Sequence, residues 1–573
     1  MFYKLDDLIK KLILGIGTLS LLYLLLLSAF GTSSMGLRNF SGSSETENWG
    51  SYCYYLPDNF LKQMLATVLA VILISAIKKA VSSYKKEIPK WFVPGVCCLY
   101  FVVGAWLILS TQMYPISDSA KVLRIAENMV QGQFDEFRVN EGYLWRYPDQ
   151  LGIVWLCYVV TLLFGEFNFI ILQFINLLAV IAIGVTAKKI CDFLWKNGTG
   201  TAVLILYFLF VPLLFYVTYI YGTILGFCFS LAAIYQELRF LKSRKLGTAV
   251  AAALLIGIAI IMKTNSMIML VAMLLFLAYD FVMEKGKGKV LIAIVMLIVF
   301  QAIFTQGLHA FMSYKSGFEV SEGMPKTAWI AMALGEGQAA PGTWNGQSVT
   351  IYENAGYDYD LANQMALESI GRSLERFADD RSEALRWLGR KIAFQWNNPT
   401  FGMAGIVQER FGEVELSPLL HSVLYGKILH ILTGCLNYLQ TFILFGCLIY
   451  FVFSRSKQGR EKFIFVVVFL GGFVFHMVWE AKPEYVLPYF LMLFPYCVNG
   501  YRSAADFLIA LAQKKVHIPK KRAIGIIAGI LGTIILFVVL YPTRLVQYTV
   551  AVQDEAELYI PYLQSIQESI WNK

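Results

Sequence analysis

Charged residues are scarce in this sequence. Asp, Glu, Lys and Arg make up 15% of its 573 residues, whereas hydrophobic residues make up 57%. Soluble domains usually contain about 25% charged residues, so the composition excludes an ordinary soluble globular protein. Long apolar runs recur from end to end, and the short alternating strands of a membrane barrel are absent. The sequence therefore predicts an all-α polytopic membrane protein.

Other common signals are missing as well. The nine cysteines are scattered, mostly within apolar runs, without the spacing of a metal site or a disulfide framework. We interpret them as small core residues. The net charge of +9 comes from basic residues in short segments between apolar runs, which is typical of cytoplasmic loops. This placement argues against nucleic-acid binding.

The apolar runs predict about 13 transmembrane helices, since a helix needs about 20 residues to cross a bilayer. The predicted spans are 11–30, 62–78, 92–113, 168–187, 202–221, 223–239, 247–264, 266–283, 290–308, 428–453, 463–479, 484–500 and 523–541. We interpret the first as a retained helix, because its apolar run is long for a secretory signal.

The apolar segment 151–165 is short for a crossing. If it spanned the membrane, every later loop would change sides. If it lies in the outer interface, the later basic clusters all fall on the cytoplasmic side, as the positive-inside rule prefers. These clusters contain Lys188, Lys189, Lys196, Lys242, Arg244, Lys245, Lys285, Lys287, Lys289, Arg455, Lys457, Arg460, Lys462, Lys514, Lys515, Lys520, Lys521 and Arg522. We therefore predict a re-entrant or juxtamembrane helix there, a cytoplasmic N-terminus and an extracytoplasmic C-terminus.

This topology divides the chain into five parts. They are an N-terminal two-helix membrane extension at 1–90, a transmembrane core at 91–308 whose first external loop is 114–167, an external region at 309–427, C-terminal transmembrane helices at 428–541, and an external tail at 542–573. The region 309–427 combines Gly and Pro turns with a charged helical stretch. Its composition is too structured for a linker.

Asp118 lies where the third predicted span leaves the membrane. Apolar residues then follow at the spacing of an interfacial amphipathic helix that ends at Gly132. One interpretation is structural: Asp118 is the N-cap or first-turn acid, bonded to free backbone N–H groups. The other is catalytic: Asp118 is a general base that removes a proton from an attacking hydroxyl. Asp149 and Glu127 are weaker candidates, for which a solvated loop acid is favoured.

The first external loop resembles that of a known class of enzymes. An Asp outside an early span, an amphipathic helix, and then Tyr147-Pro148-Asp149-Gln150-Leu-Gly before an apolar stretch resemble the GT-C class of membrane glycosyltransferases. The branch it resembles contains the bacterial relatives of the protein O-mannosyltransferase and aminoarabinose-transferase family (glycosyltransferase family 39), over roughly residues 92–500. The resemblance implies a GT-C-like core with Asp118 as the catalytic residue. It also implies substrate contacts at Arg146, Tyr147, Asp149 and Gln150.

Such enzymes use a sugar linked to a polyprenyl phosphate, so the resemblance implies cations at the outer membrane boundary that bind the phosphate. Lys263, with Asn265 beside it, lies at an outer turn between two predicted spans. We predict that both residues bind substrate. The alternative for Lys263 is a lysine that snorkels to the interface.

A second polar cluster lies in the short turn before the predicted span at 484–500. Glu480, Lys482 and Tyr485 resemble a late motif of the family, although Glu484 stands where relatives often have Arg. We predict that these three residues bind substrate, with an ordinary ion-paired turn as the alternative. His476, alone on an apolar helix, is interpreted as a buried hydrogen-bonding residue.

Many relatives carry a second external acid after the span that ends here at Tyr219-Ile-Tyr221, and this sequence has none. We therefore predict no metal ligands and expect no cofactor; a divalent metal stays open but is not favoured. Tyr219 and Tyr221 are interpreted as interfacial aromatic-belt residues in preference to a sugar pocket. Core positions are favoured over saccharide contacts for four residues of the large loop, namely Trp329, Trp344, Trp396 and Asn397.

The leading hypothesis is an inverting glycosyltransferase in the cell membrane, active on its external face. It would move a hexose or pentose from a polyprenyl-phosphate donor to a cell-wall polymer, a glycolipid or a protein. One alternative is a transporter or flippase of lipid-linked saccharides, which the scarcity of ionisable groups within the spans disfavours. Another is a glycan polymerase or ligase with a pyrophosphate-linked donor.

Overall fold

The computed structural model describes residues 2–39, 49–83, 88–138, 142–283, 287–335, 340–403, 414–453 and 459–513. The predicted span 523–541 and the predicted tail 542–573 lie outside the described residues. So do several residues of the predicted basic clusters, namely Lys285, Arg455, Lys457, Lys514, Lys515, Lys520, Lys521 and Arg522.

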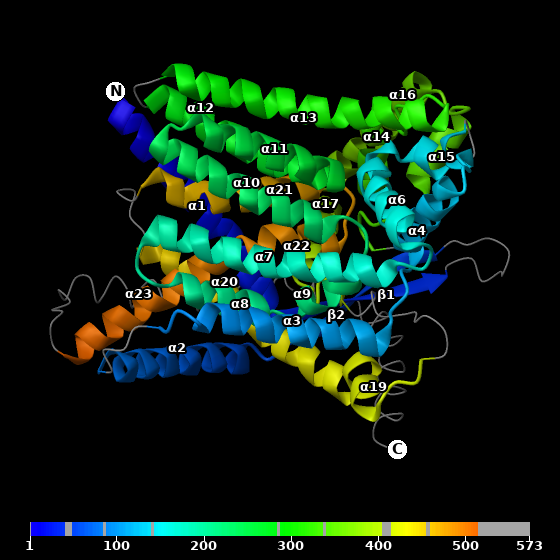
Figure 1. The fold of residues 1–573 in the computed structure, drawn as a ribbon. Coiled ribbons are helices and arrows are strands. Elements are labelled where there is room, and N and C mark those ends of the chain that lie inside the picture. The colour runs from blue at the N-terminus through cyan, green and yellow to red at the C-terminus, as the bar shows by residue number, and fades with distance from the viewer. Residues whose placement is uncertain are drawn as a thin grey trace.

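Long apolar helices form a bundle (Figure 1). Among the described residues, nine helices are long and apolar enough to cross a membrane, or ten if one bent pair counts as a span. The nine include α1 (Phe2–Phe30), α2 (Phe60–Ser83), α3 (Phe92–Thr111), α7 (Phe169–Trp195), α10 (Thr223–Ser243), α12 (Met267–Met283), α13 (Lys287–Ser316), α20 (Lys427–Phe453) and α21 (Ile464–Val478). Helix α11 (Leu246–Met262) is shorter. The predicted all-α polytopic architecture is confirmed, whereas the predicted number of spans is not.

Two predicted spans are interrupted. Helices α8 (Gly200–Leu209) and α9 (Val211–Phe215) meet at a bend of 63°. Pro212 lies at this bend, where it removes a backbone donor and disfavours helical geometry at the preceding residue. The span predicted at 484–500 consists of α22 (Pro483–Leu491) and α23 (Phe494–Ala512), with Pro495 in the first turn of α23. A proline thus accompanies each interruption.

The first predicted external loop begins and ends at the same end of the bundle. The side-chain amide of Gln173, near the start of α7, donates to the carbonyl of Met113, just after α3 (2.7 Å). Between them lie α4 (Ser117–Val130), η1 (Asp135–Phe137), α5 (Tyr143–Arg146), η2 (Pro148–Gln150) and α6 (Leu151–Phe164). Figure 1 shows α4 and α6 beside this end of the bundle. The apolar α6 therefore does not carry the chain from one end to the other.

The amphipathic pattern of α4 is buried against α6. Val122, Ile125 and Met129 are at most 3% exposed and form a small core with Val154 of α6. This core is separate from the main core of the bundle. The first loop thus folds as a compact unit that presents Asp118 at the start of α4.

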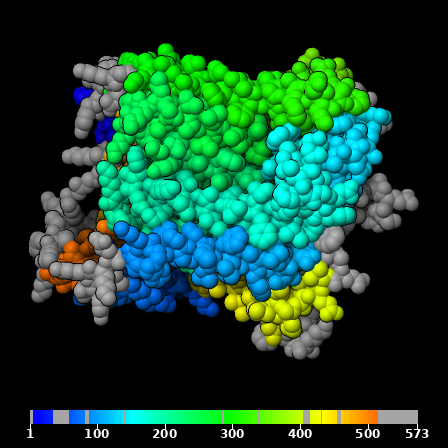
Figure 2. All heavy atoms as spheres, in the orientation of Figure 1, coloured from blue at the N-terminus to red at the C-terminus, as the bar shows by residue number. Residues whose placement is uncertain are grey.

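The region predicted at 309–427 is also structured in its described part. It contains α14 (Lys326–Leu334), α15 (Gln347–Asn354), α16 (Tyr359–Asp379), α17 (Arg381–Trp396) and α19 (Pro418–Tyr425). An antiparallel hairpin of β1 (Gly31–Asn39) and β2 (Trp49–Pro57), which we did not predict, follows α1. Figure 2 shows the surface of α4–α6 (cyan) meeting that of α13–α16 (green) at this end of the molecule.

The first two helices are not set apart from the rest of the bundle. Leu21 and Leu24 of α1 are buried in the main core, and α1 packs along α20. Helix α2 packs along α23. The N-terminal pair and the C-terminal helices therefore share one packing unit, although they are far apart in sequence.

Basic residues of the later loops gather at the other end of the bundle. Arg244, after α10, and Arg460, in η5 (Arg460–Phe463), both pair with Asp280 near the end of α12. The Lys462 ammonium lies 5.9 Å from the ring centroid of Trp195, the last residue of α7. The two ends of the bundle therefore differ in charge and in structure.

Candidate active site

Asp118 is half-buried in the first turn of α4. The N-cap position is Ile116, and no side chain caps this helix, so Asp118 is a first-turn acid and not the N-cap. Its carboxylate accepts a hydrogen bond from the Tyr221 hydroxyl (3.3 Å). The Ser119 hydroxyl donates to the carbonyl of Ile220 (2.7 Å) and ties the same turn to the loop before α10.

Buried amides of α7 hold the chain segments that carry this site. Gln173 binds the carbonyl of Met113, as described above. Asn176, one helical turn later, donates to the carbonyl of Tyr219 (3.0 Å). Both side chains are at most 5% exposed. Each such hydrogen bond contributes about 1 kcal/mol, and leaving the partner unbonded would cost more.

Tyr221 meets Lys263 because the loop before α10 lies close to the end of α11. Gly222 adopts a left-handed backbone (φ 77°), and a Cβ there would clash with the carbonyl of Met262. The Lys263 ammonium lies 3.9 Å from the ring centroid of Tyr221 and 5.4 Å from that of Tyr485. Burial lowers the pKa of Lys263 to about 8, against the opposing effect of nearby carboxylates.

The turn between α21 and α22 brings Glu480 and Lys482 to the same place. Glu480 is 4% exposed, and its carboxylate lies 3.6 Å from the Lys482 ammonium. Burial raises the pKa of Glu480. Burial opposes the charge on Lys482, but Tyr485 and the neighbouring carboxylates outweigh it, so the pKa of Lys482 lies well above its ordinary value. The sequence left an ion-paired turn as the alternative to substrate binding. The Glu480–Lys482 ion pair is present, and it lies beside Lys263 and Tyr485.

The external region supports this turn from behind. The Ala481 amide donates to the carbonyl of Gly342 (2.7 Å), in the Gly and Pro turn of the large loop. The fully buried Lys391 of α17 donates to the carbonyl of Ala333 (2.9 Å). Burial lowers the pKa of Lys391 to about 7, with Glu480 opposing. Sequence patterns did not reveal this support, because it joins residues that are far apart in the sequence.

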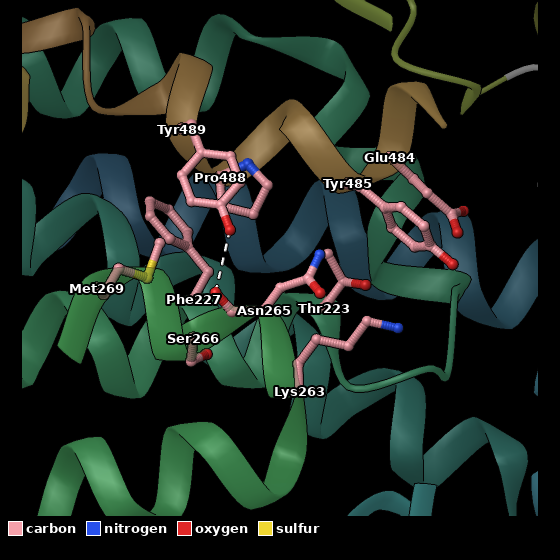
Figure 3. A pocket seen from close by; sticks show the side chains of 10 residues that line it. All are labelled: Thr223, Phe227, Lys263, Asn265, Ser266, Met269, Glu484, Tyr485, Pro488 and Tyr489. Atoms are coloured by element: carbon pink, nitrogen blue, oxygen red, sulfur yellow. Dashed lines mark hydrogen bonds between the residues drawn. The ribbon is translucent and has the colours of Figure 1, made fainter. Parts of the chain in front are cut away.

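A pocket lies between α10, α12 and α22. Its lining contains Thr223, Phe227, Lys263, Asn265, Ser266, Met269, Glu484, Tyr485, Pro488 and Tyr489. Figure 3 shows Lys263, Glu484 and Tyr485 toward one end of the pocket and Phe227 and Met269 toward the other. The pocket thus has a charged end and an apolar end. The Tyr489 hydroxyl donates to the carbonyl of Asn265 (3.0 Å) and holds the turn after α11 in place.

The predicted residues of the Tyr147 segment divide into two groups. Tyr147 lies next to the site, with its ring centroid 4.9 Å from that of Tyr143, whose hydroxyl is near that of Tyr221. Burial raises the pKa of Tyr147 to about 12. Arg146 instead pairs with Glu353 of α15 (3.1 Å). Asp149 pairs with Lys326 of α14. These two residues therefore join the first loop to the external region.

Of the two predicted amide residues, only Asn265 lines the pocket. Gln150 is half-buried at the end of η2. Asn265 lines the pocket beside Lys263. The structure thus places Asn265 next to a charged group of the site and Gln150 at the start of α6.

The aromatic-belt interpretation of Tyr221 is wrong, since the side chain is 5% exposed and faces Asp118. Tyr143, which the sequence did not single out, places its hydroxyl 3.3 Å from that of Tyr221. In the sequence, a Tyr at the end of a span is equally compatible with an interfacial aromatic belt and with a binding site. Only the packing of α4 against this loop distinguishes them.

Of the four candidates in the large loop, Trp344 is 38% exposed, so the predicted core position is wrong for it. The other three lie in packed positions. Trp396 and Asn397 are at most 4% exposed, and Asn397 donates to the backbone between α1 and β1. Trp329 stacks on Trp479, with ring centroids 6.2 Å apart. His476 is fully buried beside the ring of Tyr489. Among the described residues, no three His, Cys, Asp or Glu side chains are grouped so as to hold a metal ion.

The chain is similar to two kinds of membrane transferase among solved structures. One is the oligosaccharyltransferase AglB from Archaeoglobus fulgidus, in complex with an inhibitory peptide and a dolichol-phosphate (13% identity, TM-score 0.41, covering 81% of this chain and 56% of that one). The other is ArnT from Cupriavidus metallidurans, bound to undecaprenyl phosphate (14% identity, TM-score 0.32, covering 74% and 81%). The chain spans just over half the length of the archaeal oligosaccharyltransferase. No family model and no curated protein matches the sequence.

Proposed function

We propose that this protein is an inverting membrane glycosyltransferase. It transfers a sugar from a polyprenyl-phosphate donor to an acceptor outside the cytoplasmic membrane, such as a cell-wall polymer, a glycolipid or a protein. The observation that supports this most strongly is a convergence of distant residues. Asp118, Lys263 and Lys482 come from three separate segments and meet around two tyrosines beside one end of the helix bundle. Tyr221 contacts both Asp118 and Lys263, and the ring centroid of Tyr485 lies 5.4 Å from the ammonium groups of Lys263 and Lys482.

The three charged residues could serve the attacking group and the leaving group of a glycosyl transfer. Asp118 would take the proton of the acceptor hydroxyl as its oxygen attacks the anomeric carbon. The phosphate would leave from the opposite face of that carbon, and Lys263 and Lys482 would stabilise its charge. Glu480 would hold Lys482 in place through their ion pair.

The pocket suits a lipid-linked donor. Its charged end contains the Lys263 ammonium together with the Glu484 carboxylate, and its apolar end contains Phe227 and Met269. A polyprenyl phosphate likewise has a charged part, the phosphate headgroup, and an apolar part, the hydrocarbon chain.

Charge distribution supports an external site. The basic residues around Asp280 lie at the end of the bundle opposite to Asp118, and the positive-inside rule assigns that end to the cytoplasm. The N-terminus would then be cytoplasmic, and Asp118 would face the extracytoplasmic side of the cell membrane. Acceptors on that side are cell-envelope molecules.

The test is an Asp118→Asn variant in a strain whose surface glycan is measurable. Loss of the general base should reduce transfer by roughly 10²- to 10⁴-fold at an unchanged protein level. Asp135→Asn is the matched control, because Asp135 lies in the same loop but is exposed and paired with Arg138. It should leave the glycan unchanged. A normal glycan from a normally expressed Asp118→Asn variant would refute the proposed mechanism.

A further inference from the structure

Tyr221 contacts both charged groups to which the proposed function assigns the chemistry. Its hydroxyl donates to the carboxylate of Asp118 (3.3 Å). The Lys263 ammonium lies over the face of the same ring, 3.9 Å from its centroid. The side chain is 5% exposed, so little water reaches either contact. Low local hydration strengthens both interactions.

The surroundings of Tyr221 fix its ring in place. Gly222, the next residue, allows the close approach to the end of α11 described above. The ring of Tyr219 lies 5.8 Å away, and the Tyr143 hydroxyl lies 3.3 Å from that of Tyr221. Because these neighbours are themselves buried or held by backbone hydrogen bonds, the ring has little room to move.

The two contacts of Tyr221 are of different physical kinds. The hydroxyl is needed for the hydrogen bond to Asp118. The attraction of Lys263 depends on the negative face of the ring, which phenylalanine also has. A phenylalanine at this position would therefore keep the cation contact and lose the carboxylate contact, whereas leucine would lose both.

We infer that Tyr221 is a positioning residue that holds the general base and the phosphate-binding cation at a fixed separation, one on its hydroxyl and the other on its ring face. This inference rests on the proposed function. It extends that function, because one side chain that does not itself react contacts both the general base and the phosphate-binding cation.

The chemistry of the transfer explains why this separation matters. A bond forms between the acceptor oxygen and the anomeric carbon while the bond from that carbon to the phosphate oxygen breaks. The acceptor proton passes to Asp118, and the electron pair of the broken bond stays with the phosphate beside Lys263. The base and the cation therefore act on opposite sides of one carbon, and a misplacement of about 1 Å can cost roughly 100-fold in rate.

Two variants of one residue separate the two contacts. Purified Tyr221→Phe and Tyr221→Leu proteins would be compared with the unaltered protein for binding of undecaprenyl phosphate. The same variants would be compared in cells for surface glycan. We expect Tyr221→Phe to bind the lipid phosphate normally but to lose about 10-fold or more in transfer, since it lacks one hydrogen bond to a charged group. Tyr221→Leu should also bind the lipid phosphate about 3- to 30-fold more weakly.

Tyr158→Phe is the matched control for the Tyr-to-Phe exchange. Tyr158 lies on α6, within the same small core, and its ring centroid is 6.0 Å from the Lys315 ammonium. Its Phe variant should behave as the unaltered protein in both measurements. Normal transfer by Tyr221→Phe would overturn the inference. Equal binding of undecaprenyl phosphate by the Phe and Leu variants would overturn it too, whether both bind normally or both bind weakly.

Failure of the proposed function would look different. In that case Asp118→Asn would leave the surface glycan unchanged. The order of undecaprenyl phosphate binding, with Phe above Leu at position 221, would still decide whether the ring holds the cation.

Discussion

At the scale of single residues, burial makes the charged form of Lys263 less favourable than it would be in water. Lys263 lies between the rings of Tyr221 and Tyr485, where an ammonium loses much of its hydration. Burial lowers its pKa to about 8. A phosphate beside Lys263 would restore favourable electrostatic interactions to the ammonium, so Lys263 is suited to bind an anion.

This position predicts a pH dependence of lipid-phosphate binding. Lys263 carries its charge below a pH of about 8 and loses it above, so undecaprenyl phosphate should bind progressively more weakly as the pH rises from about 8. Lys263→Arg should retain binding at high pH, because a guanidinium does not deprotonate in this range. The measurement is a binding titration at several pH values.

Lys188→Arg is the matched control for that titration. Lys188 pairs with Asp192 near the opposite end of α7, and its exchange should leave the pH dependence as it is. If binding by the unaltered protein were independent of pH between 7 and 10, Lys263 would not be the cation that binds the phosphate.

The residues of the site were predictable from sequence to different degrees. Asp118, Lys263 and Lys482 are charged groups at the ends of apolar runs, where an ionisable side chain is conspicuous. Tyr221 is not conspicuous, because tyrosine is common at membrane interfaces. Its role follows from the loop geometry at Gly222 and the docking of α4, neither of which a linear pattern contains.

At the scale of elements, α6 is a short apolar helix that lies beside the bundle. It has 14 residues, and at 1.5 Å per residue it is about 21 Å long, which is less than the roughly 30 Å of a bilayer core. Instead it packs against α4 and against the end of α11. Gly152 makes the second contact possible, because a Cβ there would clash with the carbonyl of Ile261.

A Gly152→Ala variant should therefore displace α6 from α11. We expect a loss of about 1–3 kcal/mol in stability, as for an overpacked contact, and a lower unfolding temperature of the detergent-purified protein. Gly371→Ala on α16 is the control. Its Cβ would meet nothing, and alanine favours a helix, so stability should stay equal or rise. An unchanged unfolding temperature for Gly152→Ala would contradict the close contact.

At the scale of the whole molecule, the two ends of the bundle carry different kinds of structure. One end has the folded units around α4, α6 and α14–α17 (Figure 1). The other has short connections in which Arg244 and Arg460 share the buried carboxylate of Asp280. The sequence predicted this division because basic loops and long polar loops alternate along the chain.

Cysteine labelling in cells tests the orientation of the whole molecule. In a background without the exposed Cys98 and Cys435, Glu166→Cys should react with a membrane-impermeant maleimide added outside. Lys189→Cys, exposed near the other end of α7, should react only after permeabilisation. Labelling of position 189 from outside would invert the orientation and place Asp118 in the cytoplasm.

The sequence by itself determined the membrane class, most of the helices and the charged residues of the site. These follow from hydrophobic length, from the periodicity of α4 and from the high free energy of ionisable groups in lipid. Only the tertiary structure decided which charged residues lie close together. It paired Arg146 and Asp149 with residues of the external region, and it brought Tyr221 into contact with both Asp118 and Lys263. The reason is physical: these contacts join segments that are far apart in the sequence, and their geometry depends on how helices pack, on glycine contacts and on buried amide hydrogen bonds.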